Sequence, residues 1–211
     1  MTRTNPRVRA CWVSGIGFFL FVLLAWPVIV AGPLTVIDGA ISTWMLAQRT
    51  APLTSLLLVI SFLHGTGGIV AMSFGVALAL GLERRWKEQR FLIVVIAGGT
   101  LLNWLLKLAF HRQRPDSWHA LDSLASYRFP SGHASGSALF YATMVVLLAN
   151  TRWRRPAIAG ASLMIVMVGV SRIYLGAYFP SDVLAGVCVG VVWVSVCWLI
   201  LYPRRTHTLS S

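Results

Sequence analysis

The chain has 211 residues and a formal net charge of +12 at pH 7. Of these residues 57% are hydrophobic and only 11% are charged, a composition too apolar for an ordinary soluble domain of this size. The lipid bilayer is therefore the expected solvent. The positive charge is not a sign of nucleic-acid binding, because in a membrane protein the positions of the cations carry more information than their sum.

Long apolar runs predict an all-α protein, an integral membrane bundle of six transmembrane helices. Most runs approach the ~20 residues that a helix needs to cross ~30 Å of hydrocarbon. A further apolar stretch at 51–63 is too short to cross and has Pro52 near its start, so it is predicted to be an interfacial or re-entrant helix between the first two spans. The predicted spans cover residues 12–31, 65–82, 91–106, 134–149, 157–171 and 183–202.

The first part of the chain is predicted to be an anchor helix and an outer interfacial segment. The run at 12–31 is too long for a secretory signal and lacks a small-x-small cleavage site before Pro33. After it, Asp38, Trp44 and Arg49 alternate with apolar residues, a pattern typical of a segment along a membrane interface. The predicted division into this part, a membrane core and a cytoplasmic tail is 1–50, 51–202 and 203–211.

Lysine and arginine residues are distributed unevenly between the two predicted sides of the membrane. Most of the 18 fall on one side, and the positive-inside rule places that side in the cytoplasm with both termini. This group is Arg3, Arg7, Arg9, Arg84, Arg85, Lys87, Arg90, Arg152, Arg154, Arg155, Arg204 and Arg205. The other cations are expected near the outer face, where the rule disfavours them, so other groups must hold them there. These are Arg49, Lys107, Arg112, Arg114, Arg128 and Arg172.

Three outer segments collect the unusual polar residues: the exit of the third helix, the entrance of the fourth, and the turn between the last two. Lys107, Arg114 and Arg172 bring three fixed positive charges to this end. Residues 130–133, Pro-Ser-Gly-His, place a hydroxyl and backbone N–H groups at a helix N-terminus, which suits an anion. Clustered cations at this depth are costly unless they share a counter-ion, so the sequence predicts a phosphate-binding site.

These segments resemble the type-2 phosphatidic acid phosphatase family. The matching elements are Lys107 followed by six residues and Arg114-Pro115, then Pro130-Ser131-Gly132-His133, then Ser171-Arg172 with Asp182 ten residues after the arginine. This three-part signature is highly specific, and the resemblance covers about residues 50–202. It implies a six-helix membrane phosphatase, related in fold to vanadium haloperoxidases, that removes a terminal phosphate from lipid phosphates or pyrophosphates without a metal or other cofactor.

The resemblance also implies a role for each matching residue. His133 matches the general acid that protonates the leaving lipid oxygen, a task suited to imidazole because its pKa lies near working pH. Asp182 matches the carboxylate that orients a nucleophilic histidine, expected at position 178. The family's phosphate-binding residues fall on Lys107, Arg114, Ser131, Gly132 and Arg172.

Position 178 holds Tyr178, which is the main departure from the family pattern. A phosphohistidine hydrolyses readily, whereas a phosphotyrosine ester is far more inert, so an intermediate on Tyr178 would tend to trap the enzyme. A carboxylate at Asp182 raises the pKa of a nearby phenol and opposes the nucleophilic phenolate, whereas Arg172 and Lys107 act in the opposite direction. The sequence leaves both outcomes open.

Other histidines are weaker candidates for the nucleophile. His64, His111 and His119 are expected near the outer face, but a histidine in such a position is more often a solvated polar residue than a catalyst. His207 is in the tail, on the wrong side of the membrane. Direct attack by water on the phosphate, with His133 and Asp182 as helpers, is a further and slower route.

Three functions are compatible with these patterns. The leading one is a phosphatase acting on a lipid phosphate or isoprenyl pyrophosphate at the outer face of the inner (plasma) membrane, with its lipid substrate and the phospholipid bilayer as partners and no nucleic acid. The second is a pseudophosphatase that binds lipid phosphates without hydrolysis because of Tyr178. The third is a channel or transporter with an anion path, which does not explain the three-part spacing.

Overall fold

The computed structural model describes residues 5–30, 34–112 and 127–202, and within these ranges the chain forms eight α-helices and no strand. The all-α prediction is confirmed for this part of the chain. The helices are α1 (Pro6–Val30), α2 (Leu34–Ala47), α3 (Ala51–Leu63), α4 (Thr66–Leu82), α5 (Trp86–Phe110), α6 (Gly132–Leu147), α7 (Arg154–Tyr174) and α8 (Pro180–Leu201).

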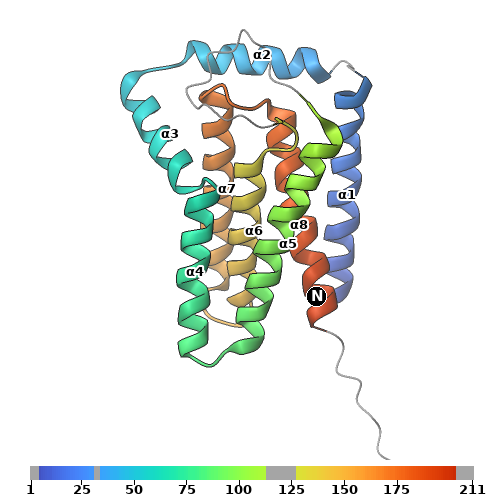
Figure 1. Ribbon diagram of the computed structural model, residues 1–211, viewed down its shortest axis with the longest axis vertical. Coiled ribbons are helices and arrows are strands. Elements are labelled where there is room, and N and C mark those ends of the chain that lie inside the picture. The colour runs from blue at the N-terminus through green and yellow to red at the C-terminus, as the bar shows by residue number, and fades with distance from the viewer. Residues whose placement is uncertain (1–4, 31–33, 113–126, 203–211) are drawn as a thin grey trace, which may run out of the picture.

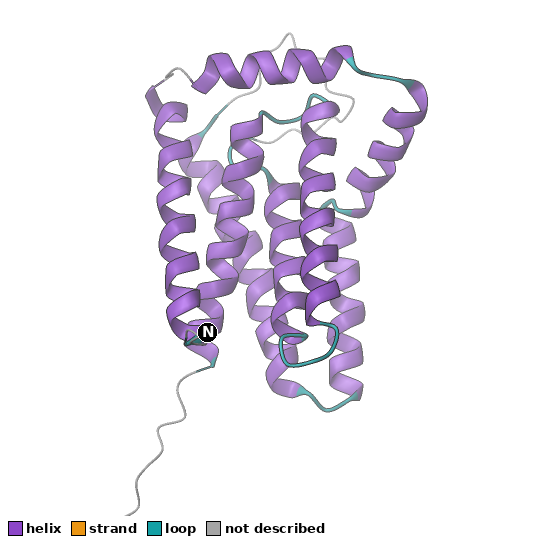
Figure 2. Ribbon diagram, turned by 180° about the vertical axis from the view of Figure 1, so that it is seen from behind, coloured by secondary structure: helices purple, strands orange, loops and turns teal. Residues whose placement is uncertain are grey.

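The central helix of the bundle is α6, which packs against α4, α5, α7 and α8 (Figure 1). The anchor helix α1 packs along α8, and Arg7 of α1 donates hydrogen bonds of 2.7 and 3.0 Å to the carbonyl oxygens of Tyr202 and Leu199. Carbonyls in the last turn of a helix have no donor of their own, so Arg7 caps α8. Across the opposite end of the bundle lies α2, nearly at right angles to the long helices (Figures 1 and 2).

Four helices, α1, α5, α7 and α8, are each long and apolar enough to cross a membrane. The neighbours α3 and α4 pass this test only as a pair, bent by 55° at the short break between them, which brings the number of candidate spans to at most five. The predicted six spans are therefore not confirmed among the described residues. The difference arises at α6, which has only 16 residues and is enclosed by other helices, so lipid contact does not set its length.

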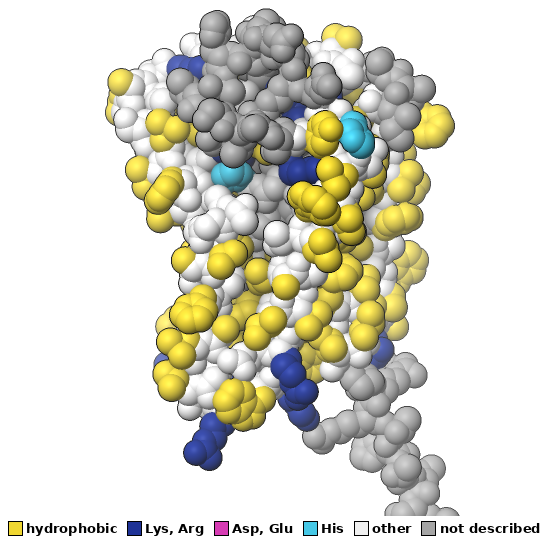
Figure 3. Space-filling view, in the orientation of Figure 1, with side chains coloured by type: hydrophobic (Ala, Val, Ile, Leu, Met, Phe, Trp, Pro, Cys, Tyr) yellow, Lys and Arg dark blue, Asp and Glu magenta, His cyan; other side chains and the backbone are white. Residues whose placement is uncertain are grey.

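The side of the bundle is apolar, and its cations gather at the two ends (Figure 3). Phe62, Phe74 and Leu82 are 81%, 70% and 78% exposed, as expected for side chains that face lipid rather than water. The basic turns between α4 and α5 and between α6 and α7 lie at the same end as the start of α1 (Figure 1). The clusters predicted to share one side of the membrane thus share one end of the molecule, as far as it is described.

Two glycines of α8 bring the start of α6 close to the start of α8. A Cβ atom on Gly186 would lie 2.5 Å from the backbone oxygen of Ser131, and one on Gly190 would lie 2.6 Å from the Cβ of Ala138. Only glycine allows this approach without moving the backbone. The backbone N–H of Ser131 then donates a 2.9 Å hydrogen bond to the backbone oxygen of Asp182, which joins two of the three signature segments.

Candidate active site

The entrance of α6 provides the anion-binding geometry that the sequence predicts. Ser131 is the N-cap residue, and its Oγ accepts a 3.4 Å hydrogen bond from the backbone N–H of Ala134. The first N–H groups of a helix have no intrahelical acceptor, and they carry the positive end of the helix dipole. A phosphate at Gly132 would therefore meet both backbone donors and a favourable field.

The last turn of α7 positions Arg172 and Tyr178 together. Gly176 has a φ of 71°, and the backbone N–H groups of Gly176 and Ala177 donate to the carbonyl oxygens of Ile173 and Arg172 at 2.9 and 3.0 Å. This pattern is a Schellman motif, in which a glycine in the left-handed region ends the helix and reverses the chain. The reversal folds Tyr178 back toward the arginine six residues before it.

Two cations flank the buried ring of Tyr178. The Nζ of Lys107 lies 5.5 Å from the ring centroid, and the Cζ of Arg172 lies 5.4 Å from it. Arg172 is fully buried and donates through Nη1 to the Oγ of Ser61 on α3, while Lys107 donates to the backbone oxygen of Tyr127. The negative face of an aromatic ring is attractive to cations, so Tyr178 offsets part of the repulsion between these two charges.

His133 and Gly132 occupy different sides of the α6 entrance. The His133 side chain lines a groove along the break between α3 and α4, and its Nε2 lies 3.5 Å from the position a Cβ on Gly65 would take. Gly132 faces α5, where an added Cβ would lie 3.8 Å from the Cε of Lys107. The imidazole is thus beside the phosphate-binding end and opens toward the side of the bundle.

Asp182 is the third residue of α8, and its carboxylate is held by groups other than Tyr178. Its Oδ2 accepts a 2.9 Å hydrogen bond from the backbone N–H of Phe179, and its Oδ1 accepts one of 2.5 Å from the Nη1 of Arg112. The Nε of Arg128 lies 3.9 Å from Oδ2. Within the described residues, Tyr178 is not a hydrogen-bond partner of this carboxylate, so the carboxylate neutralises arginines and caps α8.

Asp38 of α2 is a part of this cluster that the sequence analysis missed. Its carboxylate accepts a 2.9 Å hydrogen bond from the backbone N–H of Ser181 and another from the Ser181 hydroxyl, and it lies 3.8 Å from the Nη2 of Arg112. Only six acidic residues occur in the chain, and Asp38 stands alone in an apolar segment, which was the available signal. Asp38 and Asp182 thus supply the negative charge beside Arg112 and Arg128, at the end of the bundle that was predicted to be the outer one.

The structure brings seven of the eight predicted site residues to one end of the bundle. The eighth, Arg114, lies outside the described residues. The seven are Lys107, Ser131, Gly132, His133, Arg172, Tyr178 and Asp182.

The alternative histidines have other surroundings. His64 is buried at the break between α3 and α4, where its Nδ1 is 2.8 Å from the backbone oxygen of Ile60 and its Nε2 is 2.7 Å from the hydroxyl of Tyr141. Both of its ring nitrogens thus have partners at the break. His111 is exposed, with its ring centroid 4.5 Å from that of Tyr127. His119 and His207 lie outside the described residues.

Comparisons with known proteins identify similar membrane and lipid phosphatases. The lipid A 1-phosphatase of Rhizobium johnstonii is 33% identical over 160 residues, which cover 72% of this chain and 61% of the relative, so the match omits more than a third of that protein. Phosphatidylglycerophosphatase B of Bacillus subtilis is 27% identical over 182 residues, with coverage of 84% and 89%. The crystal structure of a transmembrane PAP2-type phosphatidylglycerolphosphate phosphatase from Bacillus subtilis matches with a TM-score of 0.84 and 25% identity, over 92% of this chain and 99% of that one.

The family model of the PAP2 superfamily matches residues 88–206, more than half of the chain. This range contains all three signature segments and the helices that carry them. The apolar sides of the bundle and its candidate spans agree with the membrane setting of the similar crystal structure. The chain is therefore a multi-pass membrane protein that belongs to the PAP2 superfamily.

Proposed function

We propose that this protein is a metal-independent phosphatase that removes the terminal phosphate of a membrane lipid phosphate or lipid pyrophosphate. The observation that carries the proposal is the placement of Lys107 and Arg172 within about 5.5 Å of the Tyr178 ring centroid, beside the N-terminus of α6. Hydrogen-bond donors that are fixed before the substrate arrives stabilise the charge of the phosphoryl-transfer transition state without having to reorient. This stabilisation is the main requirement for phosphoryl transfer. The relatives named above support the same class of reaction.

In the proposed reaction, Lys107, Arg114, Arg172 and the α6 N–H groups hold the phosphate oxygens. The attacking oxygen approaches from the Tyr178 side and belongs either to the phenol or to water. As the bond from phosphorus to the bridging oxygen breaks, His133 gives that oxygen a proton, so the lipid leaves as a neutral alcohol, or as the lipid monophosphate when the substrate is a pyrophosphate. The attacking phenol or water releases its own proton to solvent. A phosphotyrosine formed by the first route is then hydrolysed by water, which restores the phenol and releases phosphate.

The substitution of His133 by alanine should lower phosphate release by about a hundredfold or more, because the lipid oxygen would leave without a proton donor. The measurement is phosphate release by the detergent-purified protein from phosphatidic acid, phosphatidylglycerol phosphate and undecaprenyl pyrophosphate. His111→Ala is the matched control, since it removes an exposed histidine at the same end of the bundle. Equal loss in both variants would contradict the assignment of His133 as the acid.

We also propose a topology with six crossings, in which α3 and α4 form one broken span and the short α6 is another. In support, α6 runs between the same two ends as α5 and α7 (Figure 1). The described basic turns lie at one end, which would be cytoplasmic with both termini. The turn between α7 and α8 would then face the periplasmic side of an inner membrane.

Cysteine labelling tests this orientation. In a background with Cys11, Cys188 and Cys197 changed to alanine, a membrane-impermeant maleimide should label Gln48→Cys in intact spheroplasts. It should label Glu83→Cys only after permeabilisation. Both positions are exposed, at opposite ends of the bundle. The reverse labelling pattern would invert the orientation, and labelling of both from outside would exclude the proposed sidedness.

A second candidate function is lipid phosphate binding without hydrolysis. It is favoured by one observation: Asp182, which should orient a nucleophile, is committed to Arg112, Arg128 and the backbone of Phe179. Tyr178 would then serve only as an aromatic partner of the two cations. The two candidates predict different activities for Tyr178→His and Tyr178→Phe.

A further inference from the structure

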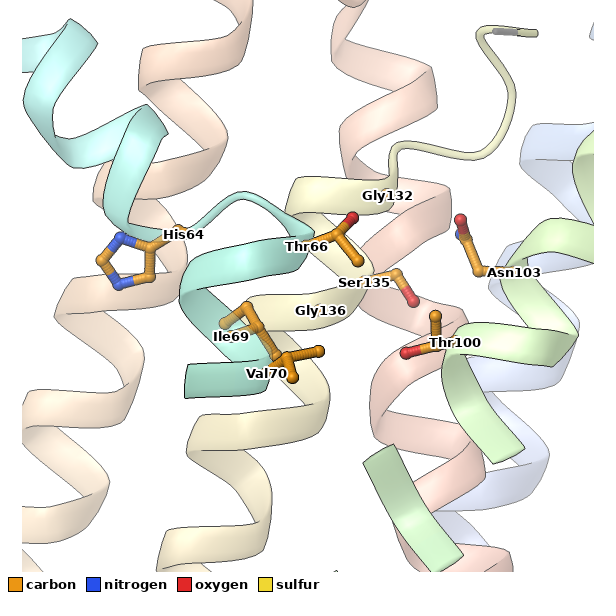
Figure 4. Close-up of a pocket in the computed structure, with 9 residues that line it drawn as sticks. All are labelled: His64, Thr66, Ile69, Val70, Thr100, Asn103, Gly132, Ser135 and Gly136. Carbon is orange, nitrogen blue, oxygen red and sulfur yellow. The ribbon is translucent and has the colours of Figure 1, made fainter. Parts of the chain in front are cut away.

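A small polar cavity lies directly beside the proposed phosphate site, between α4, α5 and α6 (Figure 4). Its volume is about 50 Å³, enough for one or two small groups. Figure 4 shows Thr66, Thr100, Asn103 and Ser135 extending into this space from three helices, whereas the His64 ring points away from them. Apolar lining comes from Ile69 and Val70, and Gly132 and Gly136 complete the wall.

Two buried polar atoms, in residues that line this cavity, have no hydrogen-bond partner within the described residues. They are the Nδ2 of Asn103 and the Oγ of Ser135, in side chains of residues that are 6% and 1% exposed. A buried donor that is left unpaired costs about 1 to 3 kcal/mol, so such groups usually mark a ligand or an ordered water. Both atoms can donate a hydrogen bond, so an oxygen acceptor satisfies them.

The cavity adjoins the groove into which the lipid alcohol would depart. Because the attacking and leaving oxygens are roughly in line, a substrate attacked from the Tyr178 side directs its leaving oxygen toward His133, which lines the groove at the break between α3 and α4. Thr66 lines both this groove and the cavity, so the next atoms of the lipid can reach the cavity. Asn103 is one helical turn from Lys107 on α5, and an added Cβ on Gly132 would lie 3.5 Å from its Oδ1.

The cavity's charge indicates which atoms it would accept. No lysine, arginine, aspartate or glutamate occurs among the described residues that line it. Burying a second phosphate there would therefore be expensive, whereas a neutral carbonyl oxygen needs only the donors present. Val70 and Thr100 also line an apolar groove of about 540 Å³ along α4 and α5, so hydrocarbon can follow directly after the polar group.

We propose that Asn103 and Ser135 form a specificity subsite for a neutral ester oxygen next to the phosphate, so that the protein prefers glycerolipid phosphates to isoprenyl phosphates. The inference rests on the proposed phosphate site. A glycerolipid carries an ester carbonyl a few bonds from its phosphate, which pairs with the two donors. An isoprenyl phosphate has only hydrocarbon at that point and leaves both donors unpaired, the type of mismatch that proteins discriminate strongly.

The test compares the Kd values of dioctanoyl phosphatidic acid and farnesyl phosphate by calorimetry in detergent, so that it does not depend on turnover. Asn103→Leu should weaken phosphatidic acid binding about tenfold, and Ser135→Ala about threefold, each with a smaller effect on farnesyl phosphate. The melting temperature of Asn103→Leu should not fall, because the change removes an unpaired buried amide. Ser73→Ala is the matched control: Ser73 is a buried serine with an unpartnered Oγ that lines the apolar groove rather than the cavity.

The outcomes separate this inference from the proposed function. The quantity that decides is the Kd of farnesyl phosphate divided by the Kd of phosphatidic acid. If Asn103→Leu and Ser135→Ala both bind the two lipids and keep this ratio within twofold of the wild-type value, the subsite is overturned and the phosphate site is left intact. Equal weakening by Ser73→Ala would also overturn it. Failure of the wild-type protein to bind either lipid would instead contradict the phosphate site itself, and the subsite with it.

Discussion

Replacing Tyr178 with histidine is expected to raise phosphate release from lipid phosphates by about a hundredfold or more. Position 178 is close to both Lys107 and Arg172, so in the proposed site a phosphoryl group there would meet both cations. An imidazole there would attack phosphorus as a neutral nitrogen, and the resulting phosphohistidine hydrolyses readily. The phenol must first lose its proton, and its phosphate ester is inert. The measurement is a single-turnover and steady-state comparison with phosphatidic acid.

Tyr178→Phe separates the two routes open to the native chain. If the phenol oxygen attacks, phenylalanine abolishes turnover while it keeps an aromatic ring beside the two cations. If water attacks, turnover survives in Tyr178→Phe. A native protein without turnover that gains it only in Tyr178→His is the result expected of a pseudophosphatase. Equal activity of all three proteins would exclude position 178 from the chemistry.

The local parts of the site could be predicted from the sequence because each has a short-range signal. A Pro-Ser-Gly-His tetrapeptide before an apolar run indicates a helix N-terminus, and Ser131 is the N-cap of α6. A glycine after the last apolar residues indicates a helix end, and Gly176 ends α7. Lys107 and Arg172 stood out because cations are disfavoured at the outer face. Their assigned roles stay predictions.

The long-range parts could not be predicted in this way. Asp38 is separated from Ser181 by 143 positions in the chain, and the interfacial pattern around Asp38 does not indicate which residues of the bundle it contacts. The same is true of Ser61, which accepts from Arg172 across 111 positions. Such pairs depend on how the helices pack, whereas hydrophobic patterns report only which face of a helix is buried.

The partners of Asp182 change how the substitution at position 178 is understood. The sequence suggested a carboxylate that acts directly on Tyr178 and opposes ionisation of its phenol. In the structure, Arg112 and Arg128 pair with that carboxylate, and their Cζ atoms lie 5.0 and 4.4 Å from the ring centroid of Phe179. Electrostatics near Tyr178 are therefore set mainly by Lys107 and Arg172.

Removing Arg172 should be the most damaging change to phosphate binding. Its guanidinium is fully buried, lies over Tyr178, and is anchored by Ser61, so it reaches the phosphate site already oriented. The substitution Arg172→Ala deletes a charge-assisted donor in a place that water cannot fill equally well, and we expect about a hundredfold weaker binding. Arg172→Lys keeps the positive charge but lacks the planar guanidinium with its paired donors, so its phosphate affinity should fall less than that of Arg172→Ala, yet measurably.

The measurement is the Kd of inorganic phosphate and of dioctanoyl phosphatidic acid for the purified variants, with melting temperatures to show that each folds. Arg49→Ala is the control, because Arg49 is an arginine at the same end whose Nε donates to the carbonyl oxygen of Tyr174 rather than facing position 178. Folded Arg172→Lys with unchanged affinity for both ligands would place the phosphate elsewhere. Weaker binding in the two Arg172 variants but not in Arg49→Ala, with the larger loss in Arg172→Ala, would mean that the last turn of α7 forms one wall of the site.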